Sequence, residues 1–167
     1  MRRLLTLALL ALASPVAAST FVAATVEEVA RSSHAVVRGR VVAAGARATR
    51  DGRIVTDVDV EVASAWKGAP ERTVRIVVPG GSLGWIALRV EGAPTFAPGE
   101  EVVVFLAREG PAWRVNGYGQ GKYRVAGGEA RPGLGAAKVV ARPHDRGERL
   151  VGAMSVDELE RRVRAAR

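Results

Sequence analysis

One stretch of the chain has the residue types and spacing of a catalytic nucleophile. Gly80-Gly81-Ser82-Leu83-Gly84 fits the G-x-S-x-G pattern, in which a strained strand-to-helix turn exposes a serine hydroxyl for acyl transfer. The residues that follow, Trp85 to Val90, are typical of a strand, and the alternation of strands and helices that this hydrolase fold needs is missing. We therefore interpret the stretch, with Pro79 before it, as a glycine-rich turn. A small hydrolase using Ser82, with His144 and Asp145 downstream, is the least favoured alternative.

Gly119-Gln120-Gly121-Lys122 contains the residue types of a phosphate-binding loop. A Walker A loop needs Gly at position 116 and Ser or Thr at position 123, where this chain has Asn116 and Tyr123. The spacing favours a tight hairpin whose tip presents Gln120 and Lys122. His34 and His144 lie too far apart for a metal-ligand spacing, and the chain has no Cys. The sequence therefore predicts no catalytic residue, no cofactor and no metal.

The charge balance is basic. The formal net charge is +8, and it falls to +6 if Arg2 and Arg3 are removed with a signal peptide. Arg-rich loops and an Arg-rich C-terminal segment could attach the protein to a polyanion or a membrane surface, which is one alternative function. Aromatic residues near the basic strands are few, so specific nucleic-acid binding is not expected.

The first 18 residues are typical of a secretory signal peptide. Arg2 and Arg3 form a charged start, Leu4 to Leu12 an apolar run, and Pro15 to Ala18 a small-residue cleavage site, which places Ser19 first in the mature protein. The apolar run is shorter than the roughly 20 residues of a membrane-spanning helix. We expect a periplasmic or extracellular protein with no transmembrane span in the mature chain.

Residues 19–126 have the patterns of a mainly β domain. The clearest strand runs from Ile54 to Val62, where apolar residues alternate with Asp57, Asp59 and Glu61; this spacing predicts one buried row and one solvated acidic row. Apolar runs at 35–42, 73–78, 101–107, 113–115 and 122–125 predict further strands, and 45–52 is typical of a solvated hairpin loop. Six or seven short strands separated by turns indicate a barrel or a sandwich.

Two capping-box spacings predict helices. Thr25-x-x-Glu28 predicts a short helix that ends near Ser32. Ser155-x-x-Glu158 opens an amphipathic helix over 154–167, with Val156, Leu159 and Val163 on its apolar face. The segment 127–153 between the β domain and this helix is rich in Gly, Pro and Arg, and we expect it to be a loosely ordered connection.

Two runs of residues resemble a known module. Ser33 to Val42, followed by Val58 to Gly68 with its Trp-Lys-Gly turn, is similar to the netrin-like module of the tissue inhibitors of metalloproteinases, and Glu101 to Leu106 to its later core strand. The resemblance implies an OB-type β-barrel. It does not imply the inhibitory chemistry, because that family uses an N-terminal Cys where this chain has Ser19. The chain also resembles small exported bacterial proteins that share a Pro-Gly-Gly turn, a Phe-x-x-Gly-Glu stretch and a Gly-Gln-Gly-Lys hairpin.

These observations together favour an exported, non-enzymatic binding module with an OB-like barrel of about six strands. Its partner would be a protein or another component of the bacterial envelope. The narrowest form of this hypothesis is a partner or inhibitor of an exported protease. Barrels of this kind bind through loops. The expected binding loops contain Pro79, Gly80, Gly81, Ser82, Phe96, Gly119, Gln120, Gly121 and Lys122. The sequence does not fix the ligand or the oligomeric state.

Overall fold

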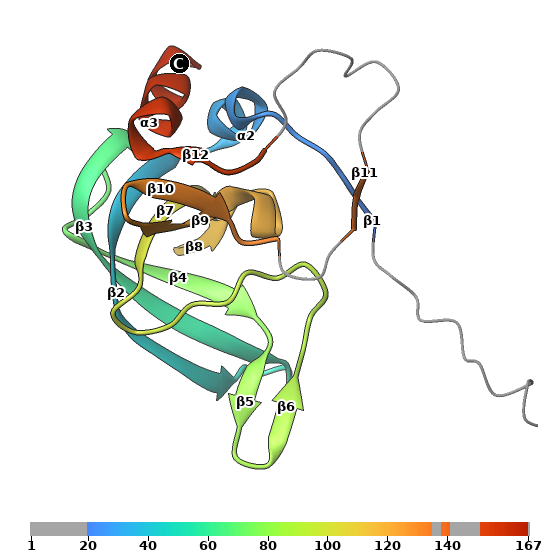
Figure 1. Ribbon diagram of the computed structural model, residues 1–167. Coiled ribbons are helices and arrows are strands. Elements are labelled where there is room, and N and C mark those ends of the chain that lie inside the picture. Colours follow the sequence, from blue (N-terminus) through green and yellow to red (C-terminus); the bar gives the residue numbers. More distant parts are fainter. Residues whose placement is uncertain (1–19, 135–137, 141–150, 167) are drawn as a thin grey trace, which may run out of the picture.

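The computed structural model describes residues 20–134, 138–140 and 151–166 and is mainly β, with a short helix near each end (Figure 1). The predicted signal peptide lies outside the described residues, as do His144 and Asp145. The helical elements are α2 (Val26–Ser32), the 3₁₀ helix η2 (Tyr118–Gly121) and α3 (Val156–Ala165). The strands are β1 (Thr20–Val22), β2 (Ala35–Ala48), β3 (Ile54–Lys67), β4 (Thr73–Pro79), β5 (Gly81–Leu83), β6 (Ile86–Leu88), β7 (Glu101–Glu109), β8 (Ala112–Val115), β9 (Lys122–Ala126), β10 (Glu129–Pro132), β11 (Lys138–Val140) and β12 (Met154–Ser155).

Eight strands form the main sheet, in the order β12-β10-β9-β7-β2-β3-β4-β8. An additional pairing joins β8 to β7, so the pairings β7-β2-β3-β4-β8-β7 return to their starting strand. All of them are antiparallel except β4 with β8, which is parallel and consists of the single pair Ile76 and Trp113. Two smaller pairs, β5 with β6 and β1 with β11, lie outside this sheet.

The buried side chains of β7 divide between two hydrophobic clusters. Val102, Val104 and Leu106 join the cluster enclosed by β2, β3 and β4, whereas Val103 and Phe105 face the cluster beneath α2 and α3. Successive side chains of a strand point to opposite faces, so a strand buried on both faces has a continuous apolar sequence. This explains the unbroken run Val-Val-Val-Phe-Leu.

The long strands β2 and β3 are bent by three register shifts, between Val36 and Val37, Arg38 and Gly39, and Val41 and Ala43. A bulge adds one residue to one strand and turns its side chains relative to the rest. Val58 and Val60 point into the cluster of β2, β3 and β4, as the alternation predicted. Trp66 has the same parity but lies at the shift opposite Val36 and Val37, between Ala65 and Lys67, and is buried beneath the helices instead.

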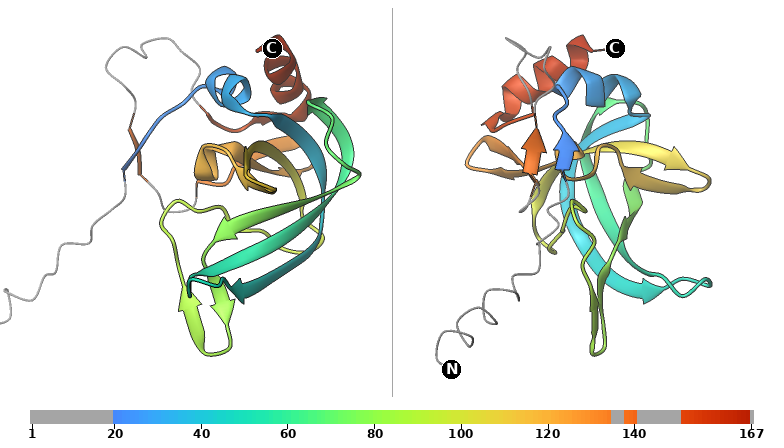
Figure 2. Two further views of the ribbon diagram at one scale, coloured as in Figure 1. Left: turned by 180° about the vertical axis from the view of Figure 1, so that it is seen from behind. Right: turned by 90° about the vertical axis from the view of Figure 1, so that its right-hand side faces the viewer.

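Both helices begin at the predicted residues and cover one end of the sheet. Thr25 and Glu28 form the complete capping box of α2, and the Ser155 side chain accepts the amide of Glu158 at the start of α3. Val156, Leu159 and Val163 are buried, which confirms the predicted apolar face. Figure 2 shows α2 and α3 side by side, at the opposite end of the molecule from the hairpin β5–β6.

Three segments differ from the sequence expectation. Residues 45–48, expected in a loop, extend β2, so the turn to β3 is confined to residues 49–53. Residues 118–121, expected at a hairpin tip, form η2. Part of 127–153, expected as a loosely ordered connection, contains β10, which pairs with both β9 and β12. Strand pairing explains the first and third differences, because residues 45–48 pair with 54–57 across the turn and β10 pairs with β9 and β12. This pairing supplies order that local composition does not encode.

Candidate functional site

Residues 80–90, which we call the arm, form the hairpin β5–β6 that projects beyond the ends of β2 and β3 (Figure 1). Its register pairs Gly81 with Leu88 and Leu83 with Ile86, leaving Gly84 and Trp85 at the tip. Gly84 has φ of +60°, a conformation that a two-residue hairpin loop favours at its first position and that glycine adopts without strain. The G-x-S-x-G stretch is therefore part of a hairpin, and the next element after it is the strand β6, where the hydrolase motif requires a helix.

The arm exposes large apolar side chains. Trp85 at the tip is 97% exposed, and Ile86, Leu88 and Leu83 are 50%, 43% and 39% exposed. Residues 80–90 include no carboxylate. Scattered apolar residues are normal on protein surfaces, but a contiguous group of them marks an interaction site. The other two tryptophans differ, because Trp66 is 1% exposed and Trp113 lies beneath the guanidinium of Arg108, 4.1 Å from its ring centre.

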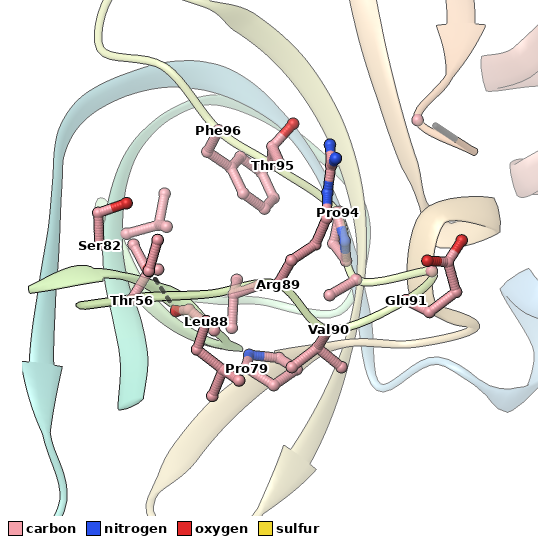
Figure 3. Close-up of a pocket in the computed structure, with 18 of the residues that line it drawn as sticks. Thr56, Pro79, Ser82, Leu88, Arg89, Val90, Glu91, Pro94, Thr95 and Phe96 are labelled. Carbon is pink, nitrogen blue, oxygen red and sulfur yellow. Dashed lines mark hydrogen bonds between the residues drawn. The ribbon is translucent and has the colours of Figure 1, made fainter. Parts of the chain in front are cut away.

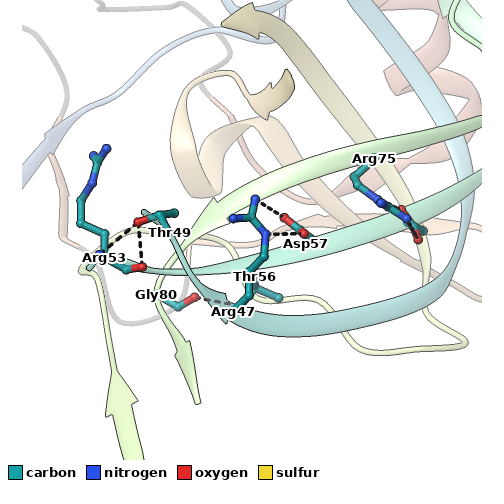
Figure 4. A network of polar contacts seen from close by, with 8 residues as sticks. Arg47, Thr49, Arg53, Thr56, Asp57, Arg75 and Gly80 are labelled. Atoms are coloured by element: carbon teal, nitrogen blue, oxygen red, sulfur yellow. Dashed lines mark hydrogen bonds and ion pairs between the residues drawn. The ribbon is translucent and has the colours of Figure 1, made fainter. Parts of the chain in front are cut away.

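The base of the arm is fixed to the ends of β2 and β3. The Gly80 amide donates to the Ile54 carbonyl over 2.9 Å, and the Thr56 hydroxyl donates to the Gly80 carbonyl over 2.8 Å (Figure 4). Gly81 has φ of +138°, and a side chain there would collide with Thr56 and Ala46. The two glycines of the Pro-Gly-Gly turn thus let the arm leave the sheet at a defined angle.

A cavity of about 490 Å³ lies between the base of the arm and residues 91–96 (Figure 3). Five residues of the predicted binding loops line it: Pro79, Gly80, Gly81, Ser82 and Phe96. Valines of β3 and β4 form its floor, and Gly133 and Leu134 also contribute. The structure therefore brings together two of the loops that sequence reasoning selected, at one end of the main sheet.

The third predicted loop has an internal position instead. Gln120 is buried, its side-chain oxygen accepts the Ala24 amide over 2.9 Å, and its nitrogen donates to the Val22 carbonyl over 3.1 Å. The residue therefore satisfies the backbone of the N-terminal segment. This corrects the expectation that Gln120 and Lys122 are accessible at a hairpin tip.

Gly119 and Gly121 are placed where backbones approach closely. The Gly119 amide donates to the Gly92 carbonyl over 3.0 Å, and a side chain at Gly119 would collide with the Gly133 carbonyl. A side chain at Gly121 would collide with the Asn116 carbonyl. The glycines of the Gly-Gln-Gly-Lys motif thus serve close packing between η2 and its neighbours.

Lys122 forms a buried ion pair. Its ammonium lies 2.6 Å from the Glu100 carboxylate, the side chains being 6% and 9% exposed, and it donates to the Thr95 carbonyl over 2.8 Å. The same ammonium lies 5.0 Å from the ring centre of Phe96. Burial lowers the pKa of Lys122, and the hydrogen bond to Glu100 opposes that shift. The pair holds residues 95–100 against β9 and thereby supports the wall of the cavity.

Two members of the predicted acidic row, Asp57 and Asp59, form ion pairs on the outer face of the sheet. Arg47 donates to both carboxylate oxygens of Asp57 over 2.7 and 3.1 Å (Figure 4). Arg75 does the same with Asp59 over 2.7 and 2.8 Å. These hydrogen bonds lower the pKa of Asp59 and raise those of Arg47 and Arg75. Because each of these arginines already has a carboxylate partner, this face offers less positive charge to a polyanion than its composition suggests.

The described residues contain neither a candidate metal site nor a candidate membrane-spanning helix. No group of three or more His, Asp or Glu side chains in residues 20–134, 138–140 and 151–166 could hold a metal ion. The described ranges also contain no helix that is long and apolar enough to span a bilayer. His34 caps the sheet, its Nδ1 accepting the Arg108 amide over 3.2 Å.

Comparisons of the chain with protein-family models, curated proteins and solved structures give no match.

Proposed function

We propose that this protein is an exported, non-enzymatic binding module that holds a protein partner through the apolar arm. The observation that carries the proposal is the 97% exposure of Trp85 at the tip of a hairpin whose base is fixed. Tryptophan is enriched among the residues that dominate binding energy at protein interfaces, where it fills a desolvated pocket of the partner. A hairpin fixed at its base presents such an anchor with little loss of entropy on binding.

The same proposal includes an OB-type barrel as the scaffold. Support comes from the five strands β2, β3, β4, β7 and β8, whose pairings return to their start, and from the single residue pair between β4 and β8. A closed but locally weak ring of five strands is typical of this partly open barrel. The netrin-like resemblance is a hypothesis within this proposal, and an exported protease as the partner is its narrowest form.

Affinity capture tests the function. Tagged mature protein, its Trp85→Ala variant and a Val42→Ala control would be incubated with envelope and culture-supernatant extracts and washed at high salt. Val42 is a matched control because it is 50% exposed on β2, outside the arm. We expect one stoichiometric protein with the wild type and the control, and its loss with Trp85→Ala. Equal capture by all three proteins would contradict the proposal.

A further inference from the structure

The cavity at the base of the arm has the size and lining of a small-molecule site. Ligand pockets typically enclose about 300 to 1,000 Å³ and combine apolar walls with a few polar groups. This cavity, at about 490 Å³, is within that range. Its lining includes Val58, Val78 and Phe96, which gives the cavity an apolar interior.

The polar groups of the cavity differ in whether they already have a partner within the protein. The Thr56 hydroxyl already donates to the Gly80 carbonyl. Arg89 lies on the rim, and Figure 3 shows its side chain rising beside Pro94 and Thr95. No ion pair to Arg89 is formed by the carboxylates of the described residues, whereas Arg47 and Arg75 each hold an aspartate. Glu91 lines the same cavity and lies to the right of Arg89 in Figure 3.

The cavity has an apolar interior and, on its rim, a guanidinium that has no carboxylate partner among the described residues. These features match a ligand with an apolar body and an anionic group. We infer that the cavity binds a small anionic amphiphile, with its apolar body between the arm and Phe96 and its anionic group at Arg89. A guanidinium presents several N–H donors and pairs with carboxylates in a bidentate geometry, so a carboxylate is the expected head group. This site is separate from the arm tip, and the inference does not depend on the proposed protein partner.

Two cavity variants test the inference by calorimetry. Decanoate, below its micelle concentration, is the probe, and decyltrimethylammonium is the control with a similar chain and the opposite charge. Ala87 is exposed on β6 and lines the cavity, so Ala87→Trp adds a large side chain at the cavity wall and outside the core. Ile86→Trp places the same side chain at a neighbouring residue outside the lining.

We expect saturable binding of one decanoate, its loss in Ala87→Trp and its retention in Ile86→Trp. Arg89→Gln should weaken decanoate binding about tenfold, the effect of losing one charged hydrogen bond, and Arg72→Gln, an exposed arginine outside the cavity, should not. Circular dichroism checks that each variant is folded.

Absence of saturable decanoate binding would overturn the inference, as would equal binding of the ammonium probe or unchanged binding by Ala87→Trp. Trp85→Ala should bind decanoate like the wild type. Failure of the partner capture and failure of the cavity site are therefore distinguishable.

Discussion

The helix-covered end of the molecule and the arm differ in the burial and the pairing of their side chains. Beneath α2 and α3, apolar groups are buried, and two cations beside them have partners: Lys67 donates to the Ala30 carbonyl over 2.7 Å, and Arg162 makes two 2.6 Å bonds to Glu27. The arm leaves Trp85 in solvent and Arg89 without a carboxylate among the described residues. This difference indicates that one end supplies stability and the other is available for binding.

The largest loss of stability is expected from a substitution at Gly121, where the backbone lies close to the Asn116 carbonyl. Gly121→Ala places a Cβ against the Asn116 carbonyl, and we expect it to cost more than about 4 kcal/mol of unfolding free energy or to prevent folding. Gly45→Ala is the control, because a Cβ there meets nothing within 4 Å. Urea denaturation measures both. Similar stabilities for the two variants would show that the contact is not required.

The buried ion pair should have the next largest effect. Lys122→Met removes the nearer cation of the buried Glu100 carboxylate and leaves only Arg124, 3.9 Å away, among the described residues, which should cost about 3 kcal/mol in denaturant unfolding. Adding Glu100→Gln removes the buried charge and keeps an acceptor for the Ala97 amide, so the double variant should be more stable than Lys122→Met. A double variant that is less stable than the single would contradict this account.

The ion pair between Glu27 of α2 and Arg162 of α3, which we call the clamp, should contribute a smaller, pH-dependent amount to the unfolding free energy. The Arg162 hydrogen bonds hold the pKa of Glu27 below its ordinary value near 4.5. A lowered carboxyl pKa stabilises the fold above pH 4.5, and that contribution is lost as the pH falls through the folded value. Arg162→Gln should therefore lose about 1 to 2 kcal/mol at pH 7 and less at pH 3.

Arg164→Gln is the matched control for this clamp, because Arg164 pairs with Glu160 on the exposed side of α3. We expect it to lose less than about 0.5 kcal/mol. An Arg162→Gln loss that is independent of pH between 7 and 3 would show that Glu27 ionisation is not involved. Thermal unfolding at several pH values makes the measurement.

The smallest stability effect is expected in the arm. Trp85→Ala removes a side chain that is almost fully in solvent, so the unfolding free energy should change by less than about 0.5 kcal/mol. Trp66→Ala, the same change at a buried tryptophan, should cost about 3 to 5 kcal/mol. Equal losses in the two variants would remove the distinction between the ends of the molecule.

Local patterns in the sequence predicted the elements that they encode directly. The capping residues Thr25 and Ser155 begin the helices, and the alternation around Val58 identifies a half-buried strand. These features depend on neighbours within about four residues along the chain. The mainly β class with a short helix near each end could therefore be predicted.

The candidate site could be predicted only in part. The Pro-Gly-Gly turn indicated where a loop begins, but nothing in it distinguishes an exposed Trp85 from a buried one. Lys122 was expected at a surface tip, although its partner Glu100 lies 22 residues away and its burial depends on packing by residues 95–100. The exposure of Trp85 and the burial of Lys122 both depend on how residues distant in sequence pack together. Local patterns in a single sequence do not reveal that packing.

Site-specific photo-crosslinking tests the central claim that the arm contacts the partner. A benzophenone amino acid would replace Trp85 in one variant and Val42 in another, since both positions are exposed. After irradiation in envelope and supernatant extracts, we predict one dominant crosslinked protein from position 85 and none from position 42. Capture of a partner with crosslinks only from position 42, or the same products from both positions, would contradict the claim.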